Sequence, residues 1–233
     1  MVYTKICMIF NSIKKMNSAI ILAGGNGTRM DSNIPKQFLV LNDKMLIQYS
    51  VDQFVKNKNI DEIIIVSCND WIQKLKYIYN NISIIKGGTS RISSSIKGLL
   101  ACNKMCQNVL IHDAARPLIS QKIINKSLNL IQKYDAVIPA IDFHDSLLNK
   151  TNMRYLDRTK IKKIQTPQSF KYNLILNAYK KLSKKNNQFT DDLSVLLNFN
   201  NKVSYKIFKG DKYNFKITTS FEFNLLKNIL YEN

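Results

Sequence analysis

The sequence feature that most constrains the fold is a short apolar run that stops abruptly at clustered glycines. Residues 19–22 are apolar and lead directly into the sequence AGGNG at residues 23–27. This pattern is typical of a buried strand that leads into a loop, and glycines let the loop backbone approach a ligand closely. Exposed N–H groups in such a loop form a concave site for anions. Because Arg29 and Lys36 add two cations, the stretch predicts a polyphosphate site.

The loop fits neither of two common nucleotide-binding motifs. A P-loop requires Gly, four residues and then Gly-Lys-Ser or Gly-Lys-Thr, which is absent here. A dinucleotide-binding fingerprint requires a third glycine, where this chain has Met30. Taken alone, the stretch therefore leaves two interpretations open: a phosphate site of another kind, or an ordinary turn with solvated charges.

Apolar runs and helical patterns alternate along the rest of the chain. This alternation favours an α/β fold, with a mostly parallel sheet and helices on both faces. For 233 residues we expect a single domain, placed at 17–233, after an N-terminal extension over residues 1–16. Strands are expected at 61–67, 82–85, 109–112, 136–141 and 203–208. Helices are expected at 45–56, at 71–79, after residue 95 to about 101, at 190–198 and at the C-terminus, and a turn at 165–170 enters a helix to about 182.

The formal net charge of the chain is +19. Such a charge suits anionic partners, so a nucleic-acid-binding protein is one alternative. The lysines are scattered, however, whereas a nucleic-acid binder gathers its charge on one face. No apolar run approaches the ~20 residues of a membrane span. We therefore expect a cytoplasmic protein with neither nucleic acid nor a membrane as partner.

Arginine is scarce in this lysine-rich chain, with five residues at positions 29, 91, 116, 154 and 158. Only arginine offers a planar fork for bidentate phosphate contacts, so these five residues are candidates for demanding positions. A second glycine turn, at 87–88, leads through Thr89 and Ser90 into a helix. It predicts either another polar-ligand site or simple capping of that helix.

Asp113 follows the expected strand at 109–112. Ligands of α/β sheets bind at the carboxyl ends of such strands. A carboxylate at that place suits Mg²⁺, which is usually held by one or two carboxylates together with substrate phosphates. The sequence therefore predicts Asp113 as a metal ligand and Mg²⁺ as the cofactor.

Taken together, these stretches resemble the IspD family, the 2-C-methyl-D-erythritol 4-phosphate cytidylyltransferases of the non-mevalonate isoprenoid pathway. The resemblance covers nearly everything from Ser18 onward. It rests on ordered blocks that read LAGGNGTRM, PKQFL, GGTSR with Ser94, IHDAARP, DR before QTPQSF, TDDLS and NFKIT. It implies a Rossmann-like nucleotidyltransferase of three layers with a protruding β-arm at about 141–162, which makes a homodimer.

The resemblance also implies a role for particular residues. Arg29 and Lys36 would stabilise charge on the α-phosphate of CTP, and Arg158 and Lys216 would position the sugar phosphate. Because the arm reaches across the dimer, Arg158 would serve the neighbouring subunit. The implied CTP-binding residues are Ala23, Gly24, Gly25, Gly27, Gly88, Ser94, Ala114 and Arg116, and the implied acceptor-binding residues are Asp145, Ser146, Arg158 and Lys216.

The expected reaction is attack by a phosphate oxygen of the acceptor on the α-phosphorus of CTP, with release of pyrophosphate. The identity of the acceptor stays open, because AGG at residues 23–25 also occurs in related enzymes that act on ribitol 5-phosphate or another polyol phosphate. The HDAARP and TDD blocks favour the methylerythritol enzyme. An inactive nucleotide-sensing relative is disfavoured, because Arg29, Lys36, Asp113, Arg158 and Lys216 are all present.

Overall fold

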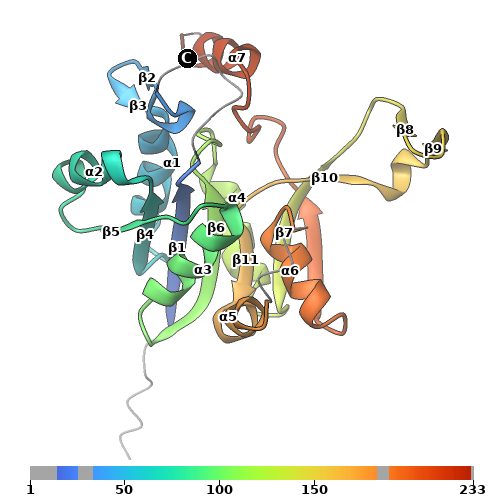
Figure 1. The fold of residues 1–233 in the computed structure, drawn as a ribbon, viewed down its shortest axis with the longest axis horizontal. Coiled ribbons are helices and arrows are strands. Elements are labelled where there is room, and N and C mark those ends of the chain that lie inside the picture. Colours follow the sequence, from blue (N-terminus) through green and yellow to red (C-terminus); the bar gives the residue numbers. More distant parts are fainter. Residues whose placement is uncertain (1–14, 26–33, 183–188, 232–233) are drawn as a thin grey trace, which may run out of the picture.

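A computed structural model describes residues 15–25, 34–182 and 189–231 of the chain. Within these residues, an eight-stranded sheet forms the centre of the molecule (Figure 1). Its strand order is β10-β7-β11-β6-β1-β4-β5, with β12 paired to β7. The strands are β1 (Met16–Ala23), β4 (Glu62–Ser67), β5 (Ser83–Lys86), β6 (Cys106–Asp113), β7 (Ala136–Asp142), β10 (Lys162–Ile164), β11 (Gln168–Lys171) and β12 (Tyr205–Lys209).

The sheet is mostly parallel, as the alternation of strands and helices predicts. Strand β1 pairs in parallel with both β4 and β6, β4 with β5, and β7 with β12. The strands β1 and β6 are buried along most of their length because apolar side chains point to both faces. Their carboxyl ends, at Ala23 and Asp113, therefore lie at the same edge of the sheet.

The prediction that residues 165–170 form only a turn into a helix is wrong. Residues Gln168–Lys171 form β11, which lies antiparallel between β6 and β7, and the helix α5 (Tyr172–Lys180) follows directly. The segment 147–164, most of which belongs to the predicted arm, has regular structure. This segment contains β8 (Leu147–Asn149), β9 (Arg154–Leu156), a 3₁₀ turn at Arg158–Lys160, and β10 at the edge of the sheet.

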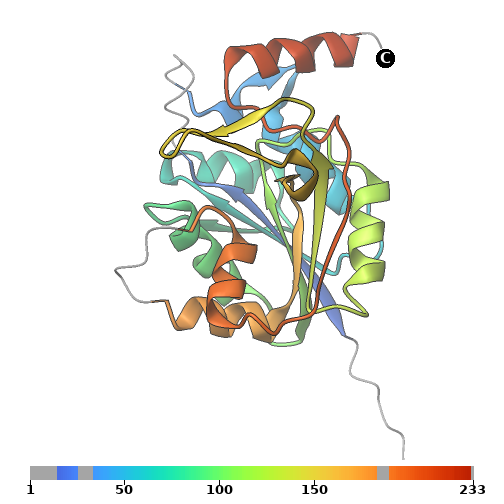
Figure 2. The same ribbon diagram turned by 90° about the vertical axis from the view of Figure 1, so that its right-hand side faces the viewer.

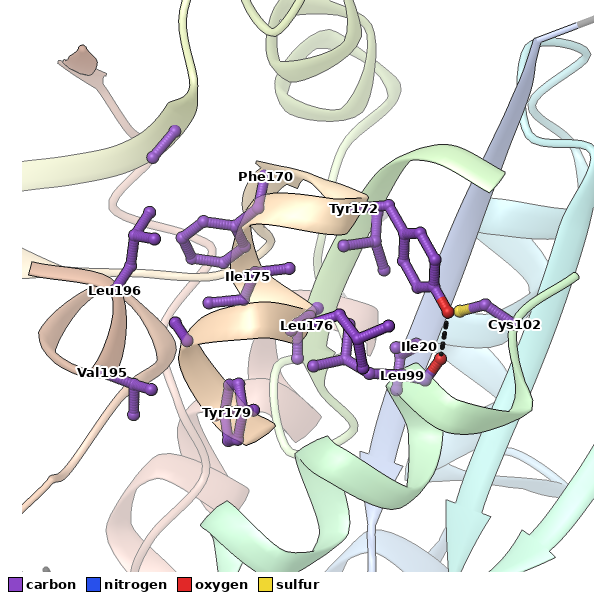
Figure 3. Packing of buried hydrophobic residues seen from close by; sticks show 14 of the residues in the cluster. Ile20, Leu99, Cys102, Phe170, Tyr172, Ile175, Leu176, Tyr179, Val195 and Leu196 are labelled. Atoms are coloured by element: carbon purple, nitrogen blue, oxygen red, sulfur yellow. Dashed lines mark hydrogen bonds between the residues drawn. The ribbon is translucent and has the colours of Figure 1, made fainter. Parts of the chain in front are cut away.

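Helices cover both faces of the sheet, which gives the three predicted layers (Figures 1 and 2). On one face, α3 (Arg91–Ala101), α5 and α6 (Asp192–Phe199) enclose a core. Figure 3 shows that α5 inserts aromatic and aliphatic side chains into this core, including Tyr172 and Tyr179. Phe170 of β11 packs in the same core. On the other face, α1 (Leu46–Val55), α2 (Ile72–Ile78) and α4 (Gln121–Leu130) enclose a second core.

Two smaller elements complete the fold. The hairpin of β2 (Val40–Leu41) and β3 (Lys44–Met45) packs against the C-terminal helix α7 (Ser220–Tyr231), through a cluster that includes Leu41 and Leu226. The β8–β9 hairpin projects from the body as the predicted arm (Figure 1). No helix within the described ranges is long and apolar enough to cross a membrane.

Candidate active site

A cavity of about 560 Å³ lies at the carboxyl edge of the parallel strands. Its walls come from the ends of β1 and β6, the 3₁₀ turn at Lys36–Phe38, the start of α3 and the segment before α6. The lining residues include Ala23, Gly24, Gly25, Lys36, Gln37, Gly88, Arg91, Ser94, Asp113 and Lys216. A second cavity, of about 450 Å³, lies near the amino end of β6 and is lined by residues 105–107 and 171–173. Only the first cavity collects the residues that the sequence singles out.

The described part of the glycine loop is held by Gln37. The side-chain amide of Gln37 donates to the carbonyl oxygens of Ala23 and Gly25, at 2.7 Å each. Gln37 and Ala23 are both buried, so the bond between them is protected from water, whereas the bond to the exposed Gly25 is only partly buried. Nothing lies within 4 Å of where a Cβ on Gly25 would stand, so this part of the backbone faces open space. The arrangement fixes a loop backbone that a ligand can approach.

The second glycine turn lies next to the first at the wall of the cavity, and a Cβ on Gly24 would stand 3.8 Å from Cα of Gly87. The hydroxyl of Ser94 accepts a hydrogen bond from the N–H of Gly88 at 3.1 Å, and a Cβ on Gly24 would stand 3.2 Å from the same oxygen. Ser90 caps α3 by accepting from the N–H of Ser93. The capping interpretation is therefore correct for Ser90, while Ser94 lies deeper and joins the two glycine turns.

Asp113 is surrounded by three cations that come from distant parts of the chain. Its Oδ2 lies 2.7 Å from Nζ of Lys216 and 4.0 Å from Nε of Arg116, and its Oδ1 lies 3.2 Å from Nε of Arg91. Lys216 reaches this place because the N–H of the next residue, Ile217, donates to the carbonyl of Ala115.

These charges fix the protonation state of the centre. Burial alone would raise the pKa of Asp113, but Arg91, Lys216 and Arg116 together hold it well below its usual range. Burial lowers the pKa of Arg91, whereas the carboxylates of Asp192 and Asp113 raise it above its ordinary value. The carboxylate and the guanidinium are therefore both charged at neutral pH. The site carries more positive than negative charge, which suits an anionic ligand.

His112, next to Asp113, is buried and neutral. Burial lowers the pKa of His112 to about 4. Its Nδ1 lies 3.1 Å from the hydroxyl of Thr166, which also accepts from the N–H of Asp113, and its Nε2 lies 3.2 Å from the carbonyl of Arg116. Nε2 therefore carries the hydrogen and donates to that carbonyl. His112 supports the turn at 113–116 and does not face the cavity.

The remaining predicted site residues divide into three groups. Ala114 and Arg116 are buried beside the cavity, and the guanidinium of Arg116 donates to the carbonyl of Asn214 at 2.8 Å. Asp145, Ser146 and Arg158 lie in or near the arm, away from the residues that line the cavity. Gly27 and Arg29 lie outside the described residues.

Sequence reasoning assigned no role to Gln37, Arg91 or Asp192. Gln37 stands inside the PKQFL block, and Arg91 is one of the scarce arginines that the sequence does single out. Asp192 stands in the TDD block. The local sequence carried a signal for each residue, but their partners lie far away along the chain, so only the fold shows what each residue binds.

The fold and this cationic, glycine-walled cavity define an α/β enzyme of the nucleotidyltransferase class. Residues 17–232 match the family model described as IspD, 2-C-methyl-D-erythritol 4-phosphate cytidylyltransferase. The chain belongs to this family of CTP-dependent cytidylyltransferases.

Named relatives agree with this assignment. A 2-C-methyl-D-erythritol 4-phosphate cytidylyltransferase of Clostridium botulinum (strain 657 / Type Ba4) is 38% identical, covering 92% of this chain and 97% of the relative. One of Clostridioides difficile (strain 630) is 36% identical, covering 92% and 94%. The crystal structure of 4-diphosphocytidyl-2C-methyl-D-erythritol synthase from Anaerococcus prevotii matches with a TM-score of 0.83 and 30% identity, covering 93% of this chain and 99% of that one.

Proposed function

We propose that this chain transfers the cytidylyl group of CTP to 2-C-methyl-D-erythritol 4-phosphate, giving 4-diphosphocytidyl-2-C-methyl-D-erythritol and pyrophosphate. The observation that carries the proposal is the cavity at the carboxyl edge of β1 and β6, where two adjacent glycine turns lie beside Lys36, Arg91 and Lys216. Family membership supplies the substrates, since the relatives are named for this reaction.

The reaction is an in-line displacement. A phosphate oxygen of the acceptor forms a bond to the α-phosphorus of CTP, and the bond from that phosphorus to the β-phosphate oxygen breaks. No general base is required, because a phosphate monoester is largely ionised at neutral pH. The main obstacle is the repulsion between two anions, so catalysis depends on positioning and on fixed positive charge.

On the nucleotide side, we assign the triphosphate to the glycine loop, including Gly24, Gly25 and Gly27. Arg29 and Lys36 would stabilise the charge that develops on the α-phosphate. Lys36 supports this role by lining the cavity beside the loop. Gly88 and Ser94, which line the cavity at the second turn, would hold the cytosine and ribose, and Ala23 would contact CTP at the start of the glycine loop. We assign Ala114 and Arg116 to the support of this wall, because both are buried beside it.

On the acceptor side, Lys216 would bind the sugar phosphate from within the cavity. The ion pair with Asp113 holds the ammonium group of Lys216 at the edge of the sheet. Asp145, Ser146 and Arg158 would contact the acceptor from the arm. These three residues lie outside the cavity of their own chain, so in our proposal they serve the site of a second subunit.

A homodimer through the arm is therefore part of the proposal. The β8–β9 hairpin exposes four apolar side chains, which is unusual for a projecting element in water. Tyr155 is 77% exposed and Met153 69% exposed, and Leu148 and Leu156 are also exposed. A partner subunit that packs against the arm would bury these four side chains. Arg158 would then reach the cavity of that partner subunit.

We propose Mg²⁺ as the cofactor, with Asp113 as the protein ligand. No group of three or more His, Cys, Asp or Glu side chains gathers into a metal cluster within the described part of the chain. Each carboxylate oxygen of Asp113 already accepts from one cation, Oδ1 from Arg91 and Oδ2 from Lys216, and each has a second lone pair that would bind Mg²⁺. Mg²⁺ commonly takes its other ligands from substrate phosphates and water. When bound, the metal would supply positive charge to the phosphates of CTP.

The test is an acceptor screen. Pyrophosphate release is measured with CTP and Mg²⁺, using 2-C-methyl-D-erythritol 4-phosphate or ribitol 5-phosphate as the acceptor. We expect release with the methylerythritol phosphate, and a kcat/KM at least tenfold lower with ribitol 5-phosphate. Faster turnover of ribitol 5-phosphate would move the assignment to the polyol alternative, which the named relatives do not favour.

A further inference from the structure

Arg91 lies between two carboxylates that differ in their access to the cavity. Its Nε is 3.2 Å from Oδ1 of Asp113, and its Nη2 is 2.6 Å from Oδ2 of Asp192. Asp113 lines the cavity, whereas Asp192 is fully buried and has no exposed surface. Arg91 therefore connects a carboxylate beside the proposed substrates to one that no substrate can reach.

Asp192 is itself fixed by a tyrosine. The hydroxyl of Tyr179 donates to Oδ1 of Asp192 at 2.5 Å. Burial, together with the charge of Asp192, raises the pKa of Tyr179 well above its usual value, so the hydroxyl stays protonated and able to donate. The ring of Tyr179 projects from α5 into the hydrophobic core that also holds Val195 and Leu196 of α6 (Figure 3). The core therefore anchors the far end of the network.

The local sequence gives no reason for a cation at position 91. Arg91 is the first residue of α3, and a positive charge in the first turn of a helix opposes the helix dipole. Asp192, the first residue of α6, has the sign that the dipole favours. The two carboxylates, and not the helix, therefore explain why Arg91 stands at this place.

Asp113 and Asp192 bind different nitrogen atoms of the Arg91 guanidinium. Arginine commonly gives both arms of its fork to a single carboxylate. Here Asp192 takes Nη2, so that Arg91 offers only Nε to Asp113. Oδ2 of Asp113 is left to Lys216, at 2.7 Å.

We propose that Asp192 is a positioning residue for cytidylyl transfer. Asp192 restrains Arg91, so that Oδ2 of Asp113 remains available to accept from Lys216. The bond between Asp113 and Lys216 then orients the ammonium group of Lys216 toward the phosphate of the acceptor. This inference rests on the proposed function, because that function assigns Lys216 to the acceptor. Without the charge on Asp192, Arg91 turns both arms toward Asp113 and displaces Lys216 from its position.

A purely structural role for Asp192 makes a different prediction. The pair of Arg91 and Asp192 also joins the start of α3 to the start of α6, so its loss lowers the stability of the fold in either case. If stability were its only role, the variant protein that remains folded would turn over the acceptor at the normal rate.

The experiment compares Asp192→Asn with wild type in steady-state kinetics with CTP, Mg²⁺ and 2-C-methyl-D-erythritol 4-phosphate. The kcat/KM for the acceptor should fall about 10- to 100-fold, the range for a displaced positioning group. The Kd for CTP, measured without acceptor and without Mg²⁺, should change less than threefold, because both glycine turns and Lys36 are untouched. Asp52→Asn is the matched control, since Asp52 also binds a tyrosine hydroxyl and a cation, Tyr79 and Lys44, away from the cavity.

Tyr179→Phe tests the same network with a smaller change. It removes only the hydroxyl that Asp192 accepts, and we expect the acceptor kcat/KM to fall about threefold to tenfold. Tyr172→Phe is its control, because Tyr172 stands on the same helix but donates to the carbonyl of Leu99 at 3.0 Å and not to Asp192 (Figure 3 shows the bond to Leu99). This control should stay within twofold of wild type.

A double variant separates positioning from stability. In a Lys216→Met background, Asp192→Asn should cause no further loss in the acceptor kcat/KM, because its effect passes through Lys216. A full additional loss would contradict the proposal, as would wild-type kinetics in folded Asp192→Asn. If Asp192→Asn does not fold, Tyr179→Phe decides, and wild-type kinetics there overturn the proposal. A wild-type chain that transfers nothing to the acceptor would instead overturn the proposed function.

Discussion

The side-chain amide of Gln37 lies 2.7 Å from the carbonyl oxygen of Ala23, although Gln37 is 14 residues further along the chain. A second bond of the same length joins Gln37 to Gly25. The two bonds fix the backbone at the end of β1, where the chain enters the glycine loop. The geometry of the loop therefore depends on Gln37, a side chain that need not touch CTP.

Replacing Gln37 with Met should therefore weaken nucleotide binding while keeping most of the side-chain volume. Two neutral hydrogen bonds at about 1 kcal/mol each correspond to roughly a 10- to 30-fold effect. We expect the KM for CTP to rise by that factor in steady-state assays. Gln132→Met is the control, because Gln132 donates to the carbonyl of Leu128 on an exposed helix end. Equal KM values for CTP in both variants would show that the two bonds of Gln37 do not contribute to nucleotide binding.

Lys36→Ala should lower kcat while the protein folds normally. The proposal gives Lys36 the charge that develops on the α-phosphate, and removing one such donor costs ~10²–10³ in rate. Lys44→Ala is a suitable comparison, since Lys44 is partly exposed and pairs with Asp52 outside the cavity. Turnover of Lys36→Ala at the wild-type rate would remove Lys36 from the mechanism.

The stability of the fold should fall as the pH drops from about 6.5 toward 4. The folded state holds His112 neutral, with a pKa of about 4, whereas the unfolded chain protonates near 6.5. The unfolded state therefore binds more protons in this window, and the free energy of unfolding decreases as the pH falls. The loss from this group between pH 7 and 4.5 is about 2–3 kcal/mol.

Urea unfolding of wild type and His112→Gln across that range checks the pH prediction. The variant is expected to be less stable at pH 7 but to lose less stability on acidification. Asp113, whose pKa is depressed, acts in a separate window: its contribution is present above its unfolded value near 3.8 and is lost at lower pH. Parallel pH curves for the two proteins would contradict the assignment to His112.

Tyr155→Asp should weaken the proposed dimer. The side chain is 77% exposed on the arm, and a carboxylate at a covered apolar surface would be costly. Sedimentation should show a shift toward monomer, and activity should fall because Arg158 no longer reaches the partner's cavity. Tyr77→Asp, at a 91% exposed position of α2, should leave both properties unchanged. A wild-type chain that sediments as a monomer at assay concentration would refute the dimer.

The sequence allowed the parallel core to be predicted because its signals are local. Apolar runs at β1, β4 and β6 are visible residue by residue, and Gly24 marks where β1 ends. Strand β11 was missed because Gln168 and Ser169 are polar, although both are buried. Gln168 accepts from the N–H groups of Asp192 and Leu193, so only its tertiary partners make this polar residue suitable for the middle of a sheet.

In the site, too, residues with a local sequence signal could be predicted, whereas tertiary contacts could not. The glycine turns, Lys36 and Asp113 could be predicted, because each residue type indicates its chemistry at its own position. The arrangement around Asp113 could not, since Lys216 is 103 residues away and Arg91 is 22 residues away. Asp192 stands in the TDD block, but the block does not indicate which cation Asp192 binds, because its partner Arg91 is 101 residues away.

A crystal structure of the chain with CTP and Mg²⁺ tests the central claim most directly. We predict that the triphosphate lies against the backbone of Gly24 and Gly25, with the α-phosphate within hydrogen-bond reach of Nζ of Lys36 and the cytosine beside Gly88 and Ser94. A triphosphate bound elsewhere, for example in the cavity lined by residues 105–107 and 171–173, would contradict the account.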